Sequence, residues 1–164
     1  MASIDSAGTL TLEKLHYVIQ AAMGWGDCHE HAFEIYDKRY SLSNFEFEED
    51  LRDLEEDGVR IHPLLGDGDH FTYEYDFGDT WIHVIEVESV SDATSPLNQA
   101  LCVDGARACP PEDCGGPRRF ADFLSATADP SNEEHDSMIE WYGGTFDPAA
   151  FNLGDANARI QRVH

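Results

Sequence analysis

The first regular pattern along the chain predicts a helix over residues 12–23. Apolar residues recur there at three- and four-residue intervals, which places them on one face of a helix. Thr11 is a favourable N-cap, and Gly24 is a favourable stop. The residues that predict the buried face are Leu12, Leu15, Val18, Ile19 and Ala22.

An aromatic alternation gives the clearest strand pattern. From Phe71 to Phe77 every second residue is aromatic, and the residues between them are polar. Gly78-Asp79 then supplies a turn, and Trp81 to Glu88 forms the return strand. We expect the first helix to cover the aromatic face. Shorter strands are predicted at His31–Tyr36 and Val59–Ile61.

The second half of the chain predicts a loop followed by helices. Cys102 to Pro117 is rich in glycine, proline and cysteine. Helices are expected over Phe120–Ala128, after a capping box of Ser131 and Glu134, and after Asp147-Pro148. The order of elements predicts an α+β fold: an antiparallel sheet with a central hairpin, an N-terminal helix on it and a helical C-terminal segment. We expect one domain, residues 1–164.

The chain is strongly acidic. There are 33 acidic and 10 basic residues, so the formal net charge is −23. Such a field disfavours direct nucleic-acid binding and anionic membranes, and it attracts a basic protein partner. The acids are spread along the whole chain, which favours a surface adapted to high salt. No apolar run reaches membrane-span length and the first residues lack a secretion signal, so we expect a cytoplasmic protein.

Familiar catalytic motifs are incomplete in this sequence. Asp76-Phe77-Gly78 matches a kinase triplet, but no glycine-rich loop or catalytic loop accompanies it. His29-Glu30-His31 lacks the second histidine that a zinc protease helix places four residues after the first; Phe33 stands there. These motifs therefore identify no enzyme class.

The cysteines suggest a metal site. Three thiols are separated by six and four residues, and glycine and proline between them permit tight turns. With a histidine such as His83 or His29 they could bind zinc, which thiolates favour. The alternative is that they are free thiols packed as small hydrophobic groups. The predicted zinc ligands are Cys102, Cys109, Cys114 and His83.

Polar residues near the hairpin turn suggest a second site. If the cysteine-rich segment packs over the end of the hairpin, carboxylates, an arginine and a histidine converge there. Such a set could bind a hard cation or perform acid–base catalysis. The alternative is a set of structural ion pairs. The candidates are Asp76, Asp79, His83, Arg107, Glu112 and Asp113.

Several segments together resemble the plasmid pRiA4b ORF-3-like family. They are Leu15–Phe33, Tyr73–His83, Gly105–Pro117 and Phe146-Asp147-Pro148, and the resemblance covers roughly residues 9 to 163. It implies a relation to plasmid-borne proteins and passengers of insertion elements, some labelled TnpR-like. It implies no particular reaction.

The resemblance also implies a difference at the N-terminus. Members of the family usually begin with a β-branched strand before the first helix, whereas this chain reaches that helix by Thr11. We therefore expect one strand of the family's sheet to be absent. An exposed sheet edge predicts a homodimer through strand pairing, or capping of the edge by residues 1–10.

Two functional interpretations remain open from the sequence. The favoured one is a non-catalytic protein-interaction module, because no nucleophile motif is present and the surface is acidic. The alternative is a metal-dependent, hydrolase-like enzyme with its site between the Asp76–His83 hairpin and the Arg107–Cys114 loop.

The net charge generates a prediction for thermal stability. We expect the melting temperature to rise as sodium chloride increases from about 0.05 M to about 2 M, because salt screens repulsion between carboxylates. Differential scanning calorimetry measures this, and potassium chloride should act alike. A flat or falling melting temperature would contradict the high-salt interpretation.

Overall fold

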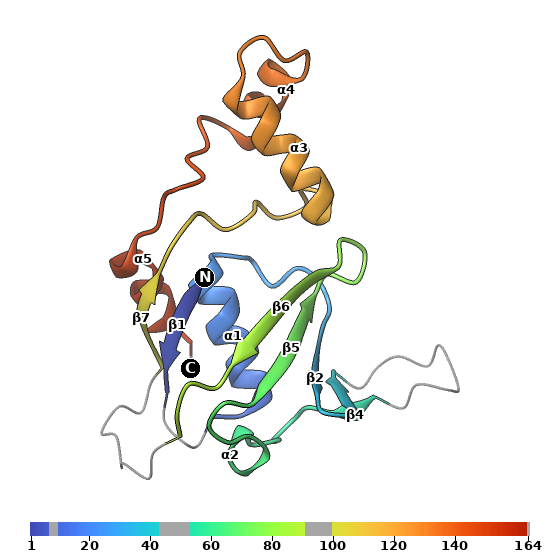
Figure 1. Cartoon of the computed structure of the whole chain (residues 1–164), viewed down its shortest axis with the longest axis vertical. Coiled ribbons are helices and arrows are strands. Elements are labelled where there is room, and N and C mark those ends of the chain that lie inside the picture. The colour runs from blue at the N-terminus through green and yellow to red at the C-terminus, as the bar shows by residue number, and fades with distance from the viewer. Residues whose placement is uncertain (7–9, 43–52, 91–99, 164) are drawn as a thin grey trace.

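The computed structural model describes residues 1–6, 10–42, 53–90 and 100–163. They form an α+β fold with two sheets, as predicted (Figure 1). The larger sheet has the strand order β4-β3-β2-β5-β6, with antiparallel neighbours except for the parallel pair β3 and β4. Its strands are β2 (His31–Ile35), β3 (Lys38–Ser41), β4 (Leu54–Glu55), β5 (His70–Tyr75) and β6 (Trp81–Glu86).

The smaller sheet and the helices complete the described fold. In that sheet β1 (Ala2–Asp5) pairs antiparallel with β7 (Leu101–Gly105). Two helices, α3 and α4, project from the top of the molecule in Figure 1. The helices are α1 (Leu12–Met23), α2 (Ile61–Leu64), α3 (Gly116–Ala128), α4 (His135–Tyr142) and α5 (Leu153–Ile160).

The first helix has the predicted ends. The Thr11 hydroxyl accepts a hydrogen bond from the Lys14 backbone N–H, and Gly24 ends the helix with a left-handed φ of 82°. Glycine adopts that conformation without a Cβ clash, and the cap satisfies backbone groups that the helix leaves free.

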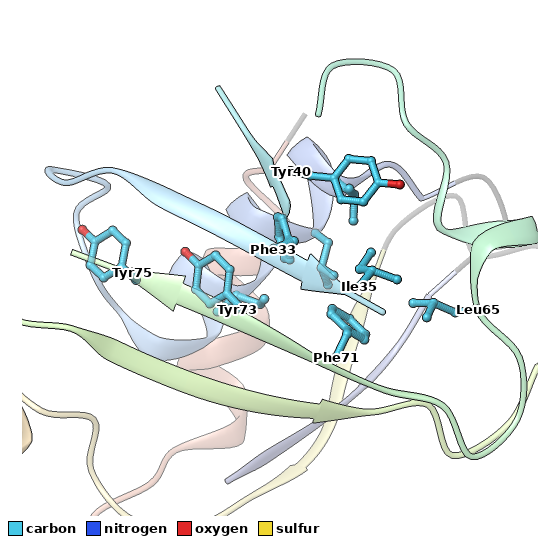
Figure 2. Packing of buried hydrophobic residues seen from close by; sticks show 10 residues of the cluster. Phe33, Ile35, Tyr40, Leu65, Phe71, Tyr73 and Tyr75 are labelled. Atoms are coloured by element: carbon cyan, nitrogen blue, oxygen red, sulfur yellow. The ribbon is translucent and has the colours of Figure 1, made fainter. Parts of the chain in front are cut away.

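The main core lies between α1 and the larger sheet. Leu12, Leu15 and Ile19 of the helix pack with aromatic residues of β2 and β5. This confirms that the helix covers the aromatic face of the hairpin. Figure 2 shows sheet and loop residues of this cluster, among them Phe33, Ile35, Tyr40, Leu65, Phe71, Tyr73 and Tyr75.

A second core lies on another side of α1. Val18 and Ala22 pack there with Ala156 and Ile160 of α5. The helix therefore joins the larger sheet to the C-terminal helix and to β7, which contributes Cys102 to the same cluster. Burial of both faces explains why most of α1 is inaccessible to solvent.

Strand positions differ from the expectations at Val59–Ile61 and Cys102–Gly105, and β1 and β4 are strands that the sequence pattern did not predict. Val59–Ile61 is not a strand: Ile61 begins α2, and pairing there is limited to an isolated bridge between Thr11 and Arg60. Conversely, the segment expected to be a loop begins within β7. A strand this short shows little alternation, so only its pairing with β1 defines it.

Two predicted helix starts are also wrong. Ser131 donates its hydroxyl to the Asp129 carboxylate, and α4 begins after Glu134 without a side-chain cap. Asp147-Pro148 forms a turn in which Asp147 accepts hydrogen bonds from Ala149 and Ala150. The last helix begins instead after Asn152, whose side chain accepts from the Asp155 N–H.

The strand β1 precedes α1 and lies against β7. Met1, just before the strand, donates its terminal ammonium to the Ala106 carbonyl and accepts from the Ala106 N–H, and the Ser3 hydroxyl donates to Glu88 at 3.5 Å. Within the described residues, the outer edge of β6 has no paired strand. The predicted homodimer through an exposed edge stays a prediction. No helix in the described residues has the length and apolar character needed to cross a membrane.

The start of α3 docks tightly on the hairpin turn. The Gly115 N–H donates to the Asp79 carboxylate at 2.9 Å. Gly116 has a φ of +78°, and a Cβ on it would overlap the Asp79 carbonyl oxygen. The site needs a glycine here both for its backbone conformation and for the close approach of two chain segments.

A pair of glycine variants tests this contact. Gly116→Ala should lower the free energy of unfolding by about 1–3 kcal/mol more than Gly143→Ala, because only the first adds a steric clash. Gly143 is the matched control, with a φ of +83° and open space around its Cβ position. Urea unfolding followed by fluorescence measures the difference, and equal losses would contradict the docking contact.

Candidate metal centre

Three chain segments meet at one end of the larger sheet. They are the loop after α1 (residues 24–30), the β5–β6 turn (residues 76–80) and residues 108–115. The Trp25 indole N–H donates to the Pro110 carbonyl at 2.9 Å. The Gly26 N–H donates to the Glu112 carboxylate at 2.8 Å. The cysteine-rich segment therefore packs against both the hairpin and the loop that follows the first helix.

A histidine and two aspartates converge where these segments meet. His29 Nε2 lies 2.9 Å from Asp113 Oδ1 and 3.6 Å from Asp76 Oδ2. The three candidate ligand atoms all lie within 4.8 Å of one another. Within the described chain, this is the one group of three or more His, Cys, Asp or Glu side chains arranged closely enough to hold a metal ion.

The orientation of Asp76 is set by the turn in which it lies. Its Oδ1 accepts hydrogen bonds from the Gly78 and Asp79 N–H groups at 3.0 and 3.1 Å. The other carboxylate oxygen therefore faces His29. The side chain is only 12% exposed. A carboxylate held by backbone donors in this way needs no rearrangement to act as a ligand.

Backbone strain accumulates in the same place. Asp76 and Asp113 have left-handed φ values of 56° and 57°, and Asp27 has 54°. Aspartate tolerates this region better than most residues, but each instance costs free energy that the surrounding contacts must offset. All three side chains accept hydrogen bonds from histidines or backbone groups in this region, which provides those contacts.

Glu112 is fixed beside the cluster by Tyr75. The Tyr75 hydroxyl donates to Glu112 Oε1 at 2.6 Å and accepts from the Cys28 N–H at 3.1 Å. Burial, and then the hydrogen bond to Glu112, raises the pKa of Tyr75 above its usual range. The hydroxyl is therefore a neutral donor at physiological pH, and it holds the loop after α1 against residues 108–115.

A buried pair of histidines lies next to these loops. The rings of His16 and His31 stack with centroids 3.5 Å apart and an angle of 7° between their planes. His31 Nε2 contacts the buried Glu56 carboxylate at 3.0 Å. His16 Nε2 contacts Asp27 at 2.8 Å. Each histidine thus has its own carboxylate, and the network ties α1 and β2 to the loop between them.

The protonation state of His16 follows from its neighbours. Its Nδ1 lies 2.8 Å from the Tyr73 hydroxyl, which accepts from Gln20 and so has its own proton available for His16. Burial, and then the electrostatic interaction with His31, lowers the pKa of His16 to about 4. These contacts fit a neutral imidazole that carries its proton on Nε2 and donates it to Asp27.

The structure separates the predicted polar candidates into three groups. Asp76 and Asp113 belong to the cluster, while Asp79 and Glu112 lie beside it and bind backbone N–H groups. The other candidates, His83 and Arg107, are not part of it. His83 lies on β6 against the rings of Trp25 and Tyr73, and Arg107 forms no ion pair among the described residues. The sequence pattern did not place His29 with the two aspartates, because they lie 47 and 84 positions away.

The predicted zinc site of Cys102, Cys109, Cys114 and His83 is not assembled. Cys102 lies on β7 in the second core, where its sulfur contacts the Asp104 carbonyl. Burial raises the pKa of Cys109 to about 12 and that of Cys114 to about 11, so both are protonated thiols. The cysteine spacing gave a wrong prediction because β7 places Cys102 next to α5, away from the hairpin turn.

The buried histidine generates a prediction for pH. The folded protein keeps His16 neutral down to about pH 4, whereas the unfolded chain protonates it near 6.5. Stability is therefore present above pH 6.5 and is lost as the pH falls toward 4. As the pH is lowered over this range, the urea concentration at the midpoint of unfolding should fall less steeply in His16→Gln than in the parent protein. The exposed His62→Gln is the matched control, and an unchanged slope in His16→Gln would contradict the assignment.

Comparisons with known proteins place the chain among its relatives. The family model described as plasmid pRiA4b ORF-3-like protein matches residues 3–155. The uncharacterized protein y4hQ of Sinorhizobium fredii is 36% identical over 157 residues, 93% of this chain and 78% of that protein. The crystal structure of MM3350, a protein of unknown function from Methanosarcina mazei, has a TM-score of 0.83, with 27% identity over 94% of this chain and 87% of that one. This chain belongs to the plasmid pRiA4b ORF-3-like family.

Proposed function

We propose that this protein binds a divalent metal ion through His29, Asp76 and Asp113 and uses it in hydrolytic chemistry. The observation that carries the proposal is the convergence of one imidazole nitrogen and two carboxylate oxygens within 4.8 Å. They come from three segments far apart in the sequence, so the tertiary fold is what brings them together.

The ligand types support a metal of intermediate hardness. One imidazole and two carboxylates suit Zn²⁺, Mn²⁺ or Fe²⁺. Three protein ligands leave coordination positions for water and substrate, as catalytic metal sites require. An ion of this kind lowers the pKa of its bound water and so generates a nucleophile at neutral pH.

The surroundings of the cluster support the same proposal. Asp76 is oriented by two backbone donors. His29 is partly exposed and Asp113 is exposed, so an ion can reach them from solvent. The net charge of −23 raises the local concentration of cations. A metal ion bound here would take the place of the hydrogen bond between His29 Nε2 and Asp113 Oδ1.

A non-catalytic interaction module is the second candidate function. The observation that favours it is the exposure of apolar side chains on β6: Ile82 is 60% and Val84 is 73% accessible. Apolar groups side by side on an unpaired edge strand suit a protein partner. A basic partner, a cytoplasmic location and work beside mobile-element machinery belong to this second proposal.

Metal titration tests the first proposal. Chelator-treated protein should bind about one Zn²⁺ or Mn²⁺ per chain in isothermal titration calorimetry. His29→Ala and Asp76→Asn should weaken binding by about tenfold or more, because each removes one of three ligands. His70→Ala is the matched control: His70 also lies beside a carboxylate, Glu86, but it belongs to no three-ligand group in the described chain.

Two further measurements complete the test. Circular dichroism must show that the Asp76→Asn protein is folded, because Asp76 also stabilises the turn. Hydrolysis of chromogenic phosphate and carboxylate esters should depend on the added metal and disappear in His29→Ala. The proposal fails if the parent protein binds neither ion, or if His29→Ala binds as tightly as His70→Ala.

A further inference from the structure

A separate pocket lies between the C-terminal end of α1 and α5. It has a volume of about 440 Å³, within the range of roughly 300–1,000 Å³ that small-molecule sites occupy. Its lining includes two arginines, two aromatic residues and one aspartate: Arg159, Arg162, Tyr17, Trp25 and Asp27. None of the candidate metal ligands lines it.

The two arginines make the pocket locally basic in an acidic protein. They are two of only 10 basic residues in a chain with 33 acidic ones. Neither forms an ion pair with a carboxylate in the described part of the chain. With Asp27 as the one acidic residue in the lining, the formal charge there is positive, opposite to the charge of the whole protein.

The position of Arg159 is fixed without a carboxylate. Its guanidinium donates to the Ala21 carbonyl at 2.6 Å and the Ala22 carbonyl at 3.2 Å. These carbonyls belong to the last turn of α1, whose partial negative charge stabilises a cation. The arginine keeps further N–H donors and its full charge for a ligand, because carbonyl acceptors do not neutralise it.

The aromatic and acidic walls of the pocket are also held in place by contacts with other residues. The Trp25 ring stacks on Tyr75 with centroids 4.8 Å apart, and its N–H is bound to Pro110. Asp27 is held from behind by His16 and by a bond from its own N–H to Gln20. A fixed aromatic surface, a fixed acceptor and two guanidinium groups therefore face one space.

We propose that this pocket binds a small organic anion that carries a flat ring and a hydrogen-bond donor. The anionic group would contact Arg159 and Arg162, the ring would lie against Trp25 or Tyr17, and the donor would meet Asp27. A phosphate and a carboxylate share this chemistry, since both accept paired hydrogen bonds from guanidinium groups. The site is independent of the proposed metal ion.

Calorimetry with two probes tests the proposal. Adenosine monophosphate carries a phosphate, and phenylalanine carries a carboxylate with an ammonium donor. Titrations contain a chelator, so that failure of the metal proposal cannot affect the result. We expect at least one probe to bind with a dissociation constant below about 1 mM. Which of the two binds more tightly identifies the anionic group.

A charge-matched pair of variants locates the binding. Arg162→Glu and Arg118→Glu change the net charge equally, but Arg118 lies on α3 and does not line the pocket. Arg162→Glu should weaken binding by about tenfold or more, and Arg118→Glu by less than about twofold. Equal effects of the two variants, or no binding of either probe at about 10 mM, would overturn the proposal.

Discussion

The contact between residues 115–116 and the hairpin turn is the interaction on which the candidate site depends. Gly116 packs so closely on the Asp79 carbonyl that no side chain fits between them, and the adjacent N–H binds the Asp79 carboxylate. This contact fixes the distance between Asp113 and the turn that carries Asp76. A shift of about 1 Å there would separate the ligand atoms, because a metal tolerates little variation in distance.

Beneath this contact, polar groups replace part of the apolar core. Tyr73 and Tyr75 alternate with polar residues on β5. The Tyr73 hydroxyl bonds to His16 and Gln20 of α1, and the Tyr75 hydroxyl bonds to Cys28 in the loop after α1 and to Glu112. In the described residues no buried side-chain nitrogen or oxygen lacks a hydrogen-bond partner. A network satisfied to this degree is directional, so it fixes the loop more precisely than apolar packing does.

The loop after α1 serves both proposed sites. Trp25 and Asp27 line the basic pocket, whereas His29 belongs to the metal cluster. Residues of one short segment thus contribute side chains to two different sites. The two sites have opposite local charge. One acidic protein can present both a cation site and an anion site because contacts within a few ångströms decide binding at each. The field of the net charge of −23 is screened beyond about 10 Å.

The sequence by itself determined the α+β class, the capped first helix, the aromatic hairpin and the packing of one on the other. Those features depend on local periodicity and caps, which single segments encode: Thr11 and Gly24 bound the helix, and alternation from Phe71 identifies β5. Only the tertiary structure decided the site. It placed His29 between Asp76 and Asp113, sent Cys102 to another core and moved the last helix start to Asn152. The reason is physical: contacts between distant segments depend on how loops cross the sheet, and no local pattern records that path.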